Sequence, residues 1–194
     1  MKTKIVIVLF VCLSFINCSE DKDDFPNELP AFTQEGKDTA GCLVDGELVL
    51  KRGTRNLAAL PEVSISKPAS DRNFWSLNIS FLDVFFNERS GASIDIIFKS
   101  EDEIIIDQPY VLEEFSNTNN SKAALLSFNP LGEFSIIDAK TNLNSTGILT
   151  ITKMKLEGDV PFIAGTFDFQ ANSGEGRVFS VTDGRFDLKI DEIN

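Results

Sequence analysis

A strict alternation of large apolar and polar side chains is the feature that most limits the folds open to this chain. Residues 75–81 read WSLNISF and residues 94–98 read IDIIF. A period of two puts successive side chains on opposite faces of an extended strand, so each segment predicts a β-strand with one buried face. Shorter strand candidates lie at 110–114 and 123–128, and a longer one at 147–156. Helical candidates at 57–60 and 121–126 are too short to organise a fold.

The strand pattern predicts an all-β protein. Seventeen phenylalanines supply a sizeable core, and no internal repeat or heptad pattern interrupts the strand signals. Segments rich in Asn, Ser and Gly are short and separate one strand candidate from the next. We therefore expect a single antiparallel β-sandwich or flattened β-barrel that ends in a C-terminal three-stranded meander.

That meander is predicted over residues 166–171, 177–182 and 185–190. Asp183-Gly184 is a signal for a primed two-residue turn, which requires a positive φ at Gly184. Pairing Ala171 with Arg177 opposes Phe169 to Phe179. The apolar residues then share one face: Phe167, Phe169, Phe179, Val181, Phe186 and Leu188. The polar residues Asp168, Arg185 and Asp187 fall on the exposed face. A bulge at Asp183-Gly184 within one long strand also flips the alternation and stays as the alternative.

The N-terminus has the features of a secretory signal. A basic start, MKTK, precedes an uncharged run at residues 5–16, too short for the roughly 20 residues of a membrane-spanning helix. The sequence FINC at residues 15–18 resembles a relaxed bacterial lipobox of the Bacteroidota type. We therefore predict a lipoprotein signal peptide at residues 1–17 and acylation of Cys18, which anchors the chain in a membrane.

The residues after Cys18 predict a tether followed by one body. Residues 18–28 are acidic and have nothing to bury, so we expect a solvated spacer. Residues 29–194 show no second composition boundary and form a single β domain. Residues 20–24 resemble the acidic signals that send Bacteroidota lipoproteins to the cell surface. We expect an outer-membrane lipoprotein exposed at the surface, with the periplasm-facing side as the alternative.

Several motifs together resemble a family of Bacteroidota lipoproteins of unknown function. They are LPAFTQEGK at residues 29–37, TAGCLVDG at 39–46, GILTITK at 147–153, GTFDF at 165–169 and TDGRFD at 182–187. The family's pattern has an aromatic residue soon after Gly46, where this chain has Leu48 and Val49. The resemblance implies the localisation and a single-domain organisation, and it implies no activity.

The composition excludes several kinds of chemistry. The chain has no histidine, which removes histidine-dependent triads and histidine-ligated zinc. Its net charge of −12 disfavours nucleic acid. Cys42 has no histidine to activate it, so we expect a buried core residue, with an intermolecular disulfide as the alternative. Trp75 alternates in phase with apolar residues and is also expected in the core.

Paired carboxylates, as in a glycosidase, are the remaining catalytic pattern in the sequence. Asp168 and Asp187 lie in the family motifs, but their expected exposure favours a surface ion pair with Arg185 over catalysis. We expect no catalytic residue, metal or cofactor.

Three functional hypotheses follow from the sequence. The first is a lipid-anchored, non-catalytic envelope domain that binds a small molecule, a glycan or an envelope partner. The second is a carboxylate-dependent hydrolase at the cell surface. The third is a structural accessory of an outer-membrane complex.

Overall fold

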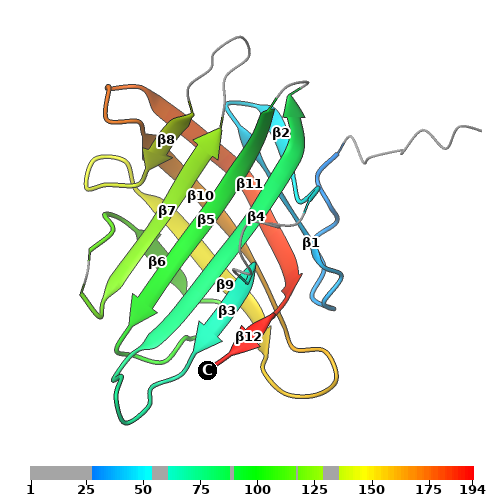
Figure 1. Ribbon diagram of the computed structural model, residues 1–194, viewed down its shortest axis with the longest axis vertical. Helices are drawn as coiled ribbons and strands as arrows, with labels where there is room; N and C mark the ends of the chain where they lie inside the picture. The colour runs from blue at the N-terminus through cyan, green and yellow to red at the C-terminus, as the bar shows by residue number, and fades with distance from the viewer. Residues whose placement is uncertain (1–27, 54–60, 88–89, 117, 129–135) are drawn as a thin grey trace, which may run out of the picture.

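The computed structural model describes residues 28–53, 61–87, 90–116, 118–128 and 136–194 (Figure 1). These residues form twelve strands and no helix. The strands are β1 (Thr39–Val44), β2 (Glu47–Leu50), β3 (Val63–Ser66), β4 (Trp75–Asn87), β5 (Ser90–Ser100), β6 (Pro109–Leu112), β7 (Ser121–Phe128), β8 (Ile137–Lys140), β9 (Gly147–Lys155), β10 (Phe162–Asn172), β11 (Val178–Lys189) and β12 (Glu192–Ile193).

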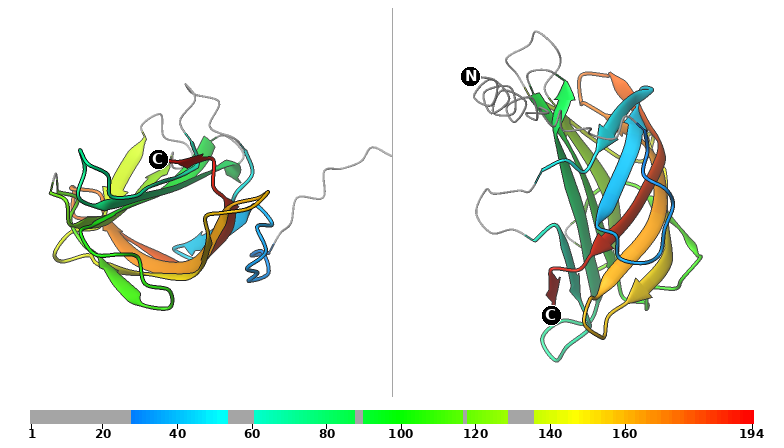
Figure 2. Two further views of the ribbon diagram at one scale, coloured as in Figure 1. Left: turned by 90° about the horizontal axis from the view of Figure 1, so that it is seen from below. Right: turned by 90° about the vertical axis from the view of Figure 1, so that its right-hand side faces the viewer.

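All strands belong to one sheet that curls on itself. Neighbouring strands follow the order β12-β3-β4-β5-β7-β8-β10-β11-β1-β2. In addition, β9 pairs with β10 on one side and with β6 on the other. Every pairing is antiparallel except that of β12 with β3. Seen from below, β3, β4, β5 and β7 form one layer, and β9, β10, β11 and β1 form the other (Figure 2). The predicted sandwich or flattened barrel is confirmed. Its C-terminal meander consists of β9, β10 and β11, not of the three segments predicted between residues 166 and 190.

Phenylalanine rings fill the space between the layers. Five phenylalanines are at most 2% exposed: Phe81, Phe98, Phe167, Phe179 and Phe186. Rings from the two layers meet directly: Phe81 lies 6.2 Å from Phe167, and Phe128 lies 5.0 Å from Phe179 in an edge-to-face contact. Such packing is typical of a solid protein core. The interior is therefore occupied by side chains.

The curled sheet is tied together at two points. Near β2, the Arg52 amide donates to the Leu82 carbonyl at 3.0 Å. The buried Asp83 carboxylate also accepts bonds from the Leu50 amide at 2.9 Å and from Arg52 Nε and Nη2 at 3.0 and 2.7 Å. At the other end, the Asp191 amide donates to the Val63 carbonyl at 2.9 Å, where β12 joins β3. Side-chain and backbone bonds thus hold the two layers in register.

One long strand replaces the hairpin predicted at Asp183-Gly184. β11 runs through both residues, and its pairing with β10 shifts between Phe169↔Val181 and Phe167↔Gly184. The extra residue makes a β-bulge, in which Asp183 has a φ of 55° and Gly184 has no positive φ. The bulge flips the alternation, so Val181 and Phe186 both point inward. The expected hairpin and the positive φ at Gly184 were wrong, and the bulge alternative is correct.

The register of the β10–β11 hairpin also differs from the prediction. Asn172 pairs with Val178, so Phe169 lies opposite Val181 and Ala171 opposite Phe179. The Asn172 side chain accepts a bond from the Gly174 amide at 2.8 Å, and this tight loop takes Arg177 out of the strand. All six predicted apolar residues are nevertheless buried, because the shift keeps the same face inward.

Candidate functional site

Asp187 lies in a different environment from the one predicted. It is 2% exposed. Its carboxylate accepts four hydrogen bonds from the loop at residues 33–37, hereafter the 33–37 loop. The donors are Thr33 Oγ1 at 2.6 Å and the amides of Glu35, Gly36 and Lys37 at 3.0, 2.8 and 3.2 Å. The predicted exposure of Asp187 was therefore wrong, because a segment about 150 residues away in sequence covers it.

These contacts give Asp187 a structural role. Burial alone raises the pKa of Asp187, but the four hydrogen bonds outweigh it and hold the pKa below its ordinary value. No ion pair within 4 Å joins Arg185 to Asp187 in the described structure. Arg185 instead donates to the carbonyl oxygens of Asp183 and Pro30, at 3.3 and 3.4 Å. The predicted surface ion pair is wrong.

Asp168 lies on the outer face, as predicted. Its Oδ1 accepts a bond from the Asp183 amide at 2.8 Å, at the β11 bulge. The pKa of Asp168 is raised above its ordinary value, mainly because the carboxyl group is partly buried. The hydrogen bond from the Asp183 amide lowers this pKa, and the negative charge of Asp183 raises it. Asp187 pairs with Ala164 on β10, four residues from Asp168. Four residues of strand span about 13 Å. That separation exceeds the spacing of either kind of glycosidase carboxylate pair.

A surface hollow of about 430 Å³ surrounds Asp168, hereafter the β9–β11 hollow. Its polar side chains are those of Asn144, Thr146, Asp168, Gln170, Ser180 and Thr182. Apart from Asp168, these side chains make no hydrogen bond among the described residues. Ile148 adds an exposed aliphatic wall. The hollow therefore offers donors and acceptors of both kinds beside one carboxylate.

Gly147 keeps the strands close under this hollow. A Cβ at Gly147 would lie 2.3 Å from Phe169 Cβ and 2.5 Å from the Asp168 carbonyl oxygen. Close approach of β9 to β10 therefore depends on a missing side chain. The alternating polar residues of 166–171 and 178–182 predict which side chains point outward. No sequence signal indicates that the loop at 142–146 borders them.

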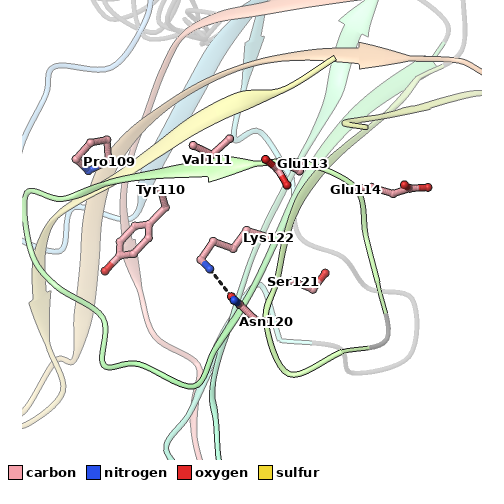
Figure 3. A pocket seen from close by; sticks show the side chains of 8 residues that line it. All are labelled: Pro109, Tyr110, Val111, Glu113, Glu114, Asn120, Ser121 and Lys122. Carbon is pink, nitrogen blue, oxygen red and sulfur yellow. Dashed lines mark hydrogen bonds between the residues drawn. The ribbon is translucent and has the colours of Figure 1, made fainter. Parts of the chain in front are cut away.

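A second hollow of about 300 Å³ lies between β6 and the start of β7, hereafter the β6–β7 cleft (Figure 3). β6 carries Tyr110 and leads into Glu113 and Glu114, and Lys122 comes from β7. The Glu113 amide donates to the Lys122 carbonyl at 2.7 Å, and this bond joins the two segments. The sequence analysis missed this cleft, because only the fold brings Lys122 next to Glu113.

Of the other candidate residues, Cys42 is buried as predicted, whereas Trp75 is only partly buried and not in the core. Cys42 is a free, fully buried thiol, and Trp75 packs at the edge of the core. Burial raises the pKa of the Cys42 thiol, and the charges of Asp83 and Asp168 add to the effect, so the thiol is inert. Cys18, the predicted acylation site, lies outside the described residues.

Two further properties hold for the part of the chain that the structure describes. It contains no group of three or more acidic or cysteine side chains arranged to hold a metal ion. It also has no helix of the length and apolarity that crossing a bilayer requires.

Comparisons with known proteins give no further assignment. No protein-family model matches the chain, and the searches of curated proteins and of solved structures found no match.

Proposed function

We propose that this protein is a non-catalytic binding domain of the cell envelope, anchored through acyl chains on Cys18. Its β9–β11 hollow would take a hydroxyl-rich ligand such as a glycan. The observation that carries the proposal is the group of five polar side chains in this hollow that make no hydrogen bond to any other described residue. Asn144 and Gln170 present amides, and Thr146, Ser180 and Thr182 present hydroxyls.

The chemistry of the hollow fits sugar hydroxyls. Amide and hydroxyl groups both donate and accept. Asp168 Oδ2, which accepts no hydrogen bond from the described residues, is a further acceptor. Sugar hydroxyls offer the complementary mixture. Phe169, the aromatic residue of the lining, is only 3% exposed and offers no open ring face to a sugar. We therefore expect modest affinity, with a Kd nearer millimolar than nanomolar. The filled interior disfavours the alternative of a small apolar ligand held between the layers.

The hydrolase alternative has less support. Asp168 lines the hollow, but the other motif carboxylate, Asp187, is enclosed by the 33–37 loop. A single carboxylate does not supply the acid and the second carboxylate of a common glycosidase mechanism. Turnover of a glycan that is lost in Asp168→Asn would overturn the non-catalytic proposal.

Glycan binding is tested by Gln170→Leu in the full chain. Gln170 lines the hollow, and its side chain makes no hydrogen bond to the other described residues. The variant should therefore fold normally and lose at least about tenfold in affinity. Asn78→Leu is the matched control, because Asn78 is an exposed amide on β4, in the other layer. A glycan panel followed by calorimetric titration provides the measurement. Equal affinity in both variants would contradict the proposed site.

Anchoring is tested separately by Cys18→Ala. We expect the variant to lose acylation and to leave the membrane fraction, because the lipid provides the attachment. Mass spectrometry of the mature N-terminus in the unchanged protein should show an acylated Cys18. A mature chain that begins at another residue would refute the anchoring.

A further inference from the structure

The β6–β7 cleft has binding capacity that the fold leaves unused. Lys122 Nζ donates to Asn120 Oδ1 at 2.6 Å (Figure 3). It also lies 5.2 Å from the centroid of the Phe98 ring. These contacts fix the position of the ammonium group. An ammonium has three N–H donors, so Lys122 keeps donors for a ligand.

Two carboxylates line the same cleft without being used. Glu113 and Glu114 are exposed, and neither side chain accepts a hydrogen bond from the described residues. Neither lies within 4 Å of Lys122 Nζ as an ion pair, although Glu113 is near enough to influence it electrostatically. Opposite charges thus border one hollow and leave a space between them.

We propose that the β6–β7 cleft binds an α-ammonium group together with its adjacent carbonyl oxygen, as found in a free amino acid or at the amino end of a peptide. The ammonium pairs with Glu113, and the carbonyl accepts from Lys122, while Glu114 points away from Lys122 and adds negative charge at the rim (Figure 3). This site is separate from the β9–β11 hollow and does not depend on glycan binding there.

The charges of the cleft disfavour the simpler ligands. A lone anion would be repelled by the two carboxylates of the cleft. The negative charge of Asp102, which also interacts with Lys122, adds to this repulsion. A lone cation would meet the fixed Lys122 ammonium. A ligand with both groups satisfies both sides of the cleft. The volume of about 300 Å³ equals roughly ten water molecules, which suits one or two amino-acid units.

The test is calorimetric titration of the full chain with glycylglycine. We expect binding of glycylglycine and at least tenfold weaker binding of N-acetyl-glycylglycine, which lacks the ammonium. Free glycine separates the two sources. Glycine that binds as well as glycylglycine indicates a free amino acid, and weaker glycine binding indicates a peptide end. Either result supports recognition of the ammonium and carbonyl groups by the cleft. If neither glycine nor glycylglycine binds, the proposal is overturned.

Variants locate the binding in the cleft. Lys122→Met keeps the apolar stem that covers Phe98, and Glu113→Gln changes an exposed side chain, so both should fold. We expect each to weaken glycylglycine binding at least tenfold. Lys153→Met and Glu157→Gln are the matched controls, because both residues are exposed and lie outside the cleft. Should Lys122→Met fail to fold, Glu113→Gln decides alone. Unchanged affinity in Glu113→Gln would refute the site.

Discussion

Two carboxylates in the C-terminal motifs show how strongly surroundings change the role of one residue type. Asp168 is exposed and makes one backbone contact, whereas Asp187 is enclosed and accepts four hydrogen bonds. A buried carboxylate is tolerated where hydrogen bonds replace its lost hydration. At the scale of the residue, Asp187 is therefore part of the fold, and Asp168 remains available to a ligand.

Asp187→Ala should lower the free energy of unfolding by about 2–4 kcal/mol, because four hydrogen bonds to a charged group are lost. Asp168→Ala should cost less than about 1 kcal/mol, because it removes a single contact of an exposed side chain. Urea unfolding of the full chain would rank the two variants. Equal costs would mean that the 33–37 loop adds no stability through Asp187.

The same contacts predict a pH dependence. The lowered pKa means that folded Asp187 holds its proton more weakly than Asp187 in the unfolded chain. Its stabilisation is therefore complete above roughly pH 4, the unfolded pKa, and is lost as the pH falls through the lower folded pKa. The stability difference between the protein and Asp187→Asn should shrink below pH 4. Urea unfolding at a series of pH values measures it.

At the scale of the element, two Asp-Gly pairs form two different structures. Asp45 and Gly46 have φ values of 49° and 88° and close the β1–β2 hairpin as a primed turn. Asp183 and Gly184 form the bulge of β11. A Cβ at Gly184 would lie 2.3 Å from the Phe167 carbonyl oxygen. Gly46 thus allows a left-handed backbone conformation, and Gly184 leaves the space that β10 needs to approach β11.

Gly184→Ala should therefore cost more than Gly46→Ala. We expect about 3 kcal/mol or more for Gly184→Ala, because the added methyl group meets backbone that cannot move without opening β10 from β11. Gly46→Ala should cost about 1–2 kcal/mol, since its Cβ meets nothing within 4 Å and only the left-handed backbone resists it. Thermal unfolding of both variants provides the comparison. A cheaper Gly184→Ala would mean that the bulge is easily rearranged.

At the scale of the whole molecule, Arg52 and Asp83 join β2 to β4 across the curled sheet. The Asp83 carboxylate is fully buried, and Arg52 Nη2 lies 2.7 Å from it. Removing one partner of a buried pair leaves an uncompensated charge. The stability of the layer arrangement therefore depends on a polar contact as well as on the phenylalanine core.

Arg52→Met should destabilise the protein by about 3–5 kcal/mol. Lys189→Met, an exposed change on β11, is the control and should have little effect. Hydrogen exchange should show earlier opening at the Leu50 amide in Arg52→Met than in the unchanged protein, because that amide donates to Asp83. Unchanged exchange at the Leu50 amide would show that the Arg52–Asp83 pair does not hold β2 against β4.

The sequence by itself determined the all-β fold class and the inward faces of β4 and β5, because alternation with a period of two is a local property of an extended chain. It indicated the burial of Phe179 and the exposure of Asp168 for the same reason, and the burial of Cys42 because no histidine is present to activate the thiol. Only the tertiary structure decided which Asp-Gly pair turns the chain, since both dipeptides are locally competent for a turn. It also decided the burial of Asp187 and the meeting of Lys122 with Glu113. Those outcomes depend on which neighbouring segments cover or approach a residue, and local periodicity carries no information about such contacts.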